Sequence, residues 1–124
     1  AERPDQRVTR MNSAQRDTLH QLVFDYLRHG QNRRALALAM LLASREGENG
    51  GADPAALRAL AVALLAVGRP GQAIEVLDRL DRAEPPAAAR HLLRSRALHQ
   101  LGEIEAARRA FRDYLDAPDR RVAA

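Results

Sequence analysis

The sequence predicts an all-α protein built from three helix–turn–helix repeats that stack into a short right-handed solenoid. Three observations favour this fold class. Apolar residues recur at three- and four-residue spacing, which places them on one face of a helix. Glycine or proline follows most of these segments. The second half of the 124-residue chain also repeats itself with a period of 34 residues.

Six helices are expected, at about residues 14–29, 32–45, 54–67, 71–83, 87–101 and 104–115. Ser13 is expected to cap the first helix. Asp53 is expected to cap the third, with Pro54 at its first position, where a missing N–H costs nothing. No segment alternates polar and apolar residues, so no strand is predicted.

Apolar spacing assigns inward-facing residues to the second, third and fourth helices. In chain order they are Ala35, Leu38, Ala39, Leu41 and Leu42; Leu57, Leu60, Ala61 and Leu64; and Ala73, Ile74, Leu77 and Leu80. Leu19, Leu22, Val23 and Tyr26 share one face of the first helix, and the sixth carries Ala107, Ala110, Phe111 and Tyr114. The fifth helix carries Leu92, Leu93 and Leu101, which indicates that it is rotated or packs differently.

A single domain is predicted over residues 13–121, with repeats at about 16–49, 54–87 and 88–121. Residues 1–12 are interpreted as a disordered N-terminus or as an added segment before a natural start at Met11. Residues 47–51 are glycine-rich and are expected to form a loop. Residues from Arg120 onward are expected to be a frayed tail, with 122–124 outside the domain.

The 34-residue period rests on matched pairs of residues. They are Leu64 and Leu98, Gly68 and Gly102, Ala73 and Ala107, and Leu77 and Phe111. At these positions the chain resembles the tetratricopeptide repeat (TPR) family. The second repeat matches best, through Leu57, Leu60, Ala61, Leu64, Gly68, Ala73, Leu77 and Pro85. The first departs at Ala39, where the family has a large residue, and the third at His91 and Arg94, where it has apolar ones.

The resemblance implies that glycines in this pattern take positive φ and end the first helix of each repeat. These are Gly30, Gly68 and Gly102. It also implies that the first helices together form a concave wall. In that register the predicted partner-binding groove comprises His20, Phe24, Leu27, Arg58, Val62, Leu65, Leu92, Arg96 and His99. Val62 and Leu65 widen the apolar arc of the third helix. Either they line this groove or they pack against a folded-back terminus.

Composition gives no indication of catalysis. The chain has no cysteine, and its four histidines lack the spacing of a metal motif, so no catalytic residue, metal site or cofactor is expected. It also has no apolar run long enough for a membrane span. The formal net charge is +4, and all 20 basic residues are arginine. They are interspersed with 16 acidic residues, and no aromatic interleaving provides a stacking platform, so nucleic acid is not the expected partner.

The segment from Gly102 to Leu115 is similar to the end of YscY-type chaperones, small TPR proteins of type III secretion. That likeness implies a chaperone in the bacterial cytoplasm that holds a small helical export substrate (YscX-type) and works with the export gate. It implies neither enzymatic activity nor a small-molecule substrate. A histidine and a phenylalanine, His20 and Phe24, occupy the places where carboxylate-clamp TPR proteins have lysine and asparagine, so that clamp is not matched.

Two alternatives remain from the sequence: a generic TPR adaptor or self-associating scaffold, and an arginine-driven nucleic-acid binder. Only nine residues follow Leu115, so the apolar side of the last helix is expected to be uncovered. A partner would cover it or, when the partner is absent, a second copy of the chain in a homodimer.

Overall fold

The structure is a computed structural model that describes residues 12–44 and 53–120. These residues contain six α-helices and no strand, which confirms the all-α prediction. The helices are α2 (Ser13–Arg28), α3 (Asn32–Ala43), α4 (Pro54–Ala66), α5 (Pro70–Ala83), α6 (Ala88–Gln100) and α7 (Ile104–Asp116). No helix in this part of the chain is long and apolar enough to cross a membrane. Predictions for the N-terminal segment before residue 12, the 47–51 loop and the tail from residue 121 concern residues outside the described ranges.

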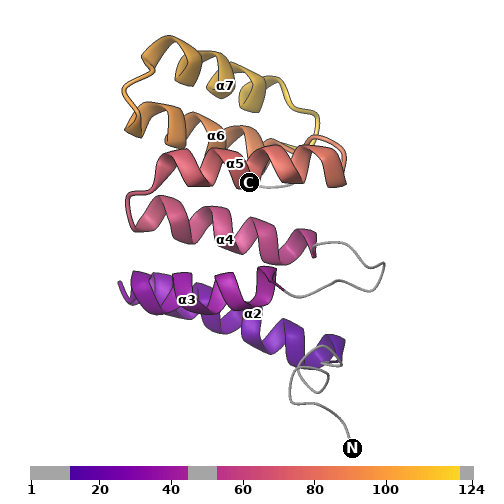
Figure 1. The fold of residues 1–124 in the computed structure, drawn as a ribbon. Helices are drawn as coiled ribbons and strands as arrows, with labels where there is room; N and C mark the ends of the chain where they lie inside the picture. The colour runs from indigo at the N-terminus through magenta and orange to yellow at the C-terminus, as the bar shows by residue number, and fades with distance from the viewer. Residues whose placement is uncertain (1–11, 45–52, 121–124) are drawn as a thin grey trace, which may run out of the picture.

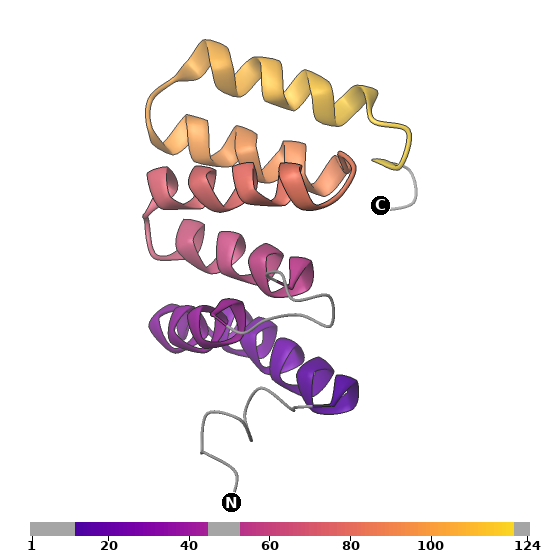
Figure 2. The same ribbon diagram turned by 45° about the vertical axis from the view of Figure 1, so that its right-hand side comes forward.

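The helices follow one another in a single row, each antiparallel to the one before it (Figure 1). The same row is seen in Figure 2, with α2 and α3 at one end and α7 at the other. Every helix packs against its neighbour in the chain, and in addition α2 contacts α4 and α4 contacts α6. The first helix of each hairpin therefore lies beside the first helix of the next.

The core is centred on α4, where eight of 13 residues are buried. Four of them are alanines, and their small side chains allow the neighbouring helices to approach closely. The largest fully buried side chains are Leu57 of α4, Leu77 and Leu80 of α5, and Val23 of α2. The inward-facing residues predicted for α4 are all buried, as are three of the four predicted for α5, with Ile74 only partly buried.

One residue predicted to face inward, Leu41, is 46% exposed, because it lies away from the side of α3 that carries the buried Ala35 and Ala39. Leu36, which the prediction omitted, is buried in its place. Phe111 is 43% exposed, which agrees with the expectation that the apolar side of the last helix is uncovered, since among the described residues no helix follows α7.

Side-chain capping explains where α2 and α4 begin. Asn12, not Ser13, caps α2: its Oδ1 accepts from the Gln15 N–H at 2.8 Å, and its own N–H donates to Gln15 Oε1 at 3.0 Å. This is a capping box, which satisfies two backbone groups reciprocally. Asp53 caps α4 as predicted, with its Oδ1 accepting from the Ala55 N–H at 3.0 Å.

Three glycines end the first helices of the hairpins. Gly30, Gly68 and Gly102 have φ values of 71°, 78° and 79°, which confirms the predicted left-handed conformation. The helix after Gly68 begins at Pro70, one residue before the predicted start, because proline fits the first turn of a helix.

Candidate protein-binding surfaces

The nine residues of the predicted groove lie on α2, α4 and α6, the three helices that contact one another in order. Their exposure differs widely. Phe24, Arg58, Arg96 and His99 are exposed; His20, Leu27, Val62 and Leu92 are partly buried; Leu65 is buried.

Two of the polar members are engaged in contacts within the chain. His20 Nε2 lies 3.6 Å from Asp53 Oδ2, and Arg16 Nη1 lies 3.3 Å from the same oxygen. Arg58 Nη1 donates to both oxygens of Glu84, at 2.8 and 3.0 Å. His20 and Arg58 occupy equivalent places 38 residues apart, the same interval as Gly30 and Gly68. Each therefore links the first helix of a hairpin to an acidic residue shortly before the first helix of the next.

Two side-chain amides reinforce this alignment of helices. Gln100 Nε2 on α6 donates to the Leu65 carbonyl oxygen of α4 at 3.5 Å. Asn32 Nδ2 at the start of α3 donates to the Ala66 carbonyl oxygen at 3.4 Å. Leu65 is only 9% exposed, so its side chain contributes to the core more than to any ligand surface.

An apolar strip remains on α2, α4 and α6. Phe24 is 42% exposed and lies one helical turn from His20, on the side of α2 that approaches the start of α4. Leu27 follows on the same side of α2, and Val62 and Leu92 are partly exposed on α4 and α6. We call these four residues the apolar strip. Their chemistry suits contact with the apolar face of another helix.

Ion pairs also link α5 to α6, and the sequence did not lead us to expect them. Arg90 is 5% exposed; its Nε lies 2.8 Å from Asp81 Oδ1 and its Nη1 3.1 Å from Glu84 Oε1. Its Nη2 also donates to the carbonyl oxygens of Glu84 and Pro85. Arg94 reaches Asp78 at 2.9 Å and Asp81 at 2.7 Å.

This ionic contact explains why the third repeat departs from the apolar pattern at Arg94. A carboxylate recurs every three residues at Asp78 and Asp81 of α5 and at Glu84 directly after it, and two arginines four apart face them from α6. That spacing is the signal in the sequence that could have revealed the contact.

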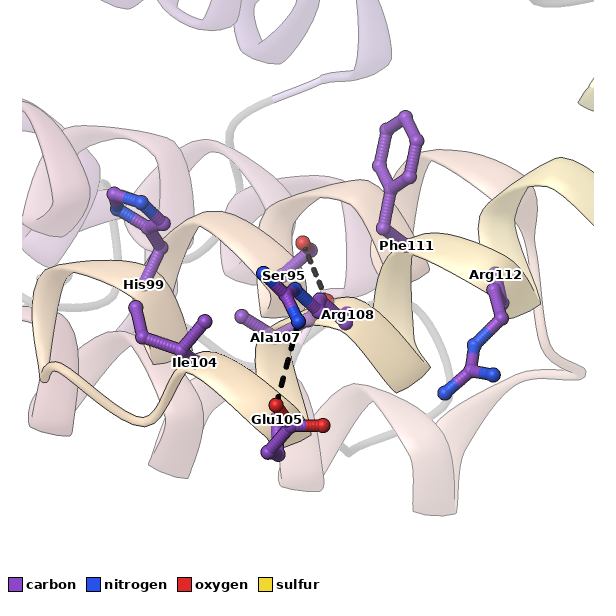
Figure 3. A pocket seen from close by; sticks show the side chains of 8 residues that line it. All are labelled: Ser95, His99, Ile104, Glu105, Ala107, Arg108, Phe111 and Arg112. Carbon is purple, nitrogen blue, oxygen red and sulfur yellow. Dashed lines mark hydrogen bonds and ion pairs between the residues drawn. The ribbon is translucent and has the colours of Figure 1, made fainter.

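A second surface lies between α6 and α7. It is an open groove of about 680 Å³, lined by Ser95, His99, Ile104, Glu105, Ala107, Arg108, Phe111 and Arg112 (Figure 3). The Ser95 hydroxyl donates to the Ala107 carbonyl oxygen at 2.8 Å, which holds the two helices close together. Arg108 Nη1 lies 3.4 Å from Glu105 Oε1, while the Phe111 ring stands clear of the ribbon. We call this surface the C-terminal groove.

Of the residues predicted for binding, only His99 lines the C-terminal groove. The sequence predicts its apolar part only in general terms, as an uncovered side of the last helix. Ile104, Phe111 and Leu115 share that side of α7, and all three are exposed.

Histidine, aspartate and glutamate side chains in the described ranges form no group of three or more that could hold a metal ion. Neither a scan against protein-family models nor a search of curated proteins found a match for this chain.

Proposed function

We propose that this chain is a TPR-like protein-binding module that holds a helical segment of a partner against α2, α4 and α6. The observation that carries the proposal is the apolar strip: Phe24, Leu27, Val62 and Leu92 keep exposed surface on three helices that contact one another in order. His20 and Arg58 hold those helices in place through Asp53 and Glu84, so the strip is presented on a preorganised support.

The TPR-like part of the proposal is supported by recurrence along the chain. Equivalent glycines end α2, α4 and α6 with positive φ, and the first helices contact one another across each hairpin. A short right-handed solenoid with these helices on its concave side is the arrangement that we propose for the repeats.

The partner that we propose is a small helical protein exported by type III secretion, bound in the bacterial cytoplasm before export and delivered to the export gate. The basis is the resemblance of the segment from Gly102 to Leu115 to YscY-type chaperones, together with the apolar rather than ionic character of the strip. In this role the chain needs no catalytic residue or cofactor.

Co-expression of the chain with each small helical protein encoded beside its gene tests this role. We expect one of them to co-purify as a stable complex. Phe24→Asp should weaken that complex at least about tenfold, because a charge would replace apolar surface worth about 1.5–3 kcal/mol on burial.

Met40→Asp is the matched control. Met40 is also exposed and apolar, but it lies on α3, outside the apolar strip, so its substitution should leave the affinity unchanged. Equal loss with both variants, or no complex with any neighbouring protein, would refute the proposed role.

The alternative function is a generic adaptor or self-associating scaffold, and the exposed apolar side of α7 favours it. Light scattering after size exclusion separates the two. A tight dimer that dissociates with Phe111→Asp and competes with partner binding would support the scaffold.

A further inference from the structure

We propose that the C-terminal groove is a docking site for one amphipathic, acidic helix of a partner protein. This helix would lie between α6 and α7 as α6 itself lies against α4 and α5. The site is distinct from the apolar strip, and it does not depend on the function proposed above.

The packing of α6 against α4 and α5 serves as a template for this docking. The groove residues Ser95, His99, Ala107 and Phe111 stand 34 residues after Ala61, Leu65, Ala73 and Leu77. Those four earlier residues lie on α4 and α5, the pair of helices that α6 contacts, and all are at most 9% exposed. The same positions on α6 and α7 form an open groove because no helix in the described ranges lies against them. The groove is therefore shaped to accommodate a helix.

Charge defines which helix the groove would accept. In the template, Asp78 and Asp81 of α5 bind Arg94 of α6. The equivalents of the two aspartates on α7 are Arg112 and Leu115. The occupant should therefore carry a carboxylate where α6 carries Arg94. It should also carry an apolar residue toward Leu115.

The opposite end of the molecule argues against a second copy stacked head to tail. Arg90, Leu93 and Ala97 of α6 correspond, 34 positions earlier, to Ala56, Ala59 and Ala63 of α4, all 0% exposed. The matching residues of α2, 38 positions earlier, are Thr18, Gln21 and Asp25. Docking that polar face on the groove would place a hydroxyl, an amide and a carboxylate where α4 has fully buried alanines, which is unfavourable.

A peptide derived from α6 provides the probe. The acidic probe is a fluorescein-labelled peptide of residues 86–101 carrying Arg90→Leu and Arg94→Glu. The basic control peptide carries Arg90→Leu alone, so the two differ only at the residue that would face Arg112. Fluorescence anisotropy is measured against the whole chain and against its Arg112→Glu variant, each checked by circular dichroism for unchanged helix content.

We expect the acidic probe to bind the natural chain at least about fivefold more tightly than the basic peptide, and this order to reverse with Arg112→Glu. Phe111→Asp should weaken both peptides. If the two peptides bind equally well to the natural chain and to the Arg112→Glu variant, the proposed orientation is wrong. No binding of either peptide would overturn the site. A stable dimer of the free chain that Phe111→Asp dissociates would show that a second copy occupies the groove, and would also overturn the proposal.

Discussion

At the junction of α5 and α6, charged residues make contacts where apolar ones would be expected. Arg90 is the clearest case, since its guanidinium satisfies two carboxylates and two carbonyl oxygens at the junction of α5 and α6. All buried side-chain nitrogen and oxygen atoms in the described residues have a hydrogen-bond partner. Loss of Arg90 would remove the donor that serves the Glu84 and Pro85 carbonyl oxygens, whereas Asp81 would keep Arg94 and Glu84 would keep Arg58.

Arg90→Ala should lower the free energy of unfolding by about 2–3 kcal/mol, because it removes a buried partner of Asp81 and Glu84. The exposed Arg79 on α5 provides the control, and Arg79→Ala should change stability by no more than about 0.5 kcal/mol. Urea unfolding followed by circular dichroism measures both. A similar loss of unfolding free energy in the two variants would show that burial of Arg90 adds nothing to its contribution to stability.

Asp53 has two roles that substitution can separate. It caps α4 through the Ala55 N–H, and it pairs with Arg16 and His20 on α2. Asp53→Ala loses both and should cost about 1–2 kcal/mol of stability. Asp53→Asn keeps the cap and should cost clearly less, because asparagine is an equally good N-cap. If the two variants unfold at the same urea concentration, the cap contributes nothing measurable.

At the scale of the element, the two ends of the helices depend on backbone geometry more than on side-chain caps. α3, α5, α6 and α7 have no side-chain cap at their N-termini. A carboxylate from elsewhere serves α6: both oxygens of Asp119 accept from the Ala88 N–H at 3.0 Å. The turns after α2, α4 and α6 instead depend on glycine in a conformation that other residues rarely adopt.

Substitution by alanine should change stability in opposite directions at Gly68 and Gly71, which lie three residues apart. Gly68→Ala should destabilise by about 1 kcal/mol, because φ is 78° there although the space is open. Gly71→Ala should stabilise by about 0.5 kcal/mol, because Gly71 lies inside α5 with nothing within 4 Å of an added Cβ. The melting temperatures of the two variants, compared with that of the natural chain, measure both effects. A shift in the same direction for both would contradict this account.

At the scale of the whole molecule, burial falls from the centre of the row toward its C-terminal end. α4 has eight buried residues, α6 three and α7 two. The contact between α5 and α6 relies on ion pairs whose carboxylates are partly exposed. Salt screens such contacts, so this boundary should be the weakest in the row.

Hydrogen exchange should reveal this gradient. Amides of α7 should exchange at least about tenfold faster than those of α4, because local opening of α7 exposes little apolar surface. Raising the salt concentration to about 1 M should increase the difference, since it weakens the attachment of α6 to α5. Mass spectrometry of peptides from each helix provides the measurement. Equal protection of α4 and α7 would show that the row opens only as a unit.

The sequence by itself determined the six helices, most of their ends and most of the central core. Glycine, proline and Asp53 act locally through backbone conformation and capping, and apolar periodicity identifies the buried side of a helix such as α4 without knowledge of its neighbours. Local pattern was insufficient for Leu41, because its exposure depends on which side of α3 the neighbouring helices cover.

Only the tertiary structure decided which polar residues are engaged and which surfaces are free. His20 and Arg58 read as groove residues in the sequence, but they bind Asp53 and Glu84, which are distant along the chain. Arg90 became buried only because α5 supplies carboxylates opposite it. The C-terminal groove likewise needs two packed helices before it exists. Helix formation depends on neighbours in sequence, whereas pairing and exposure depend on neighbours in space.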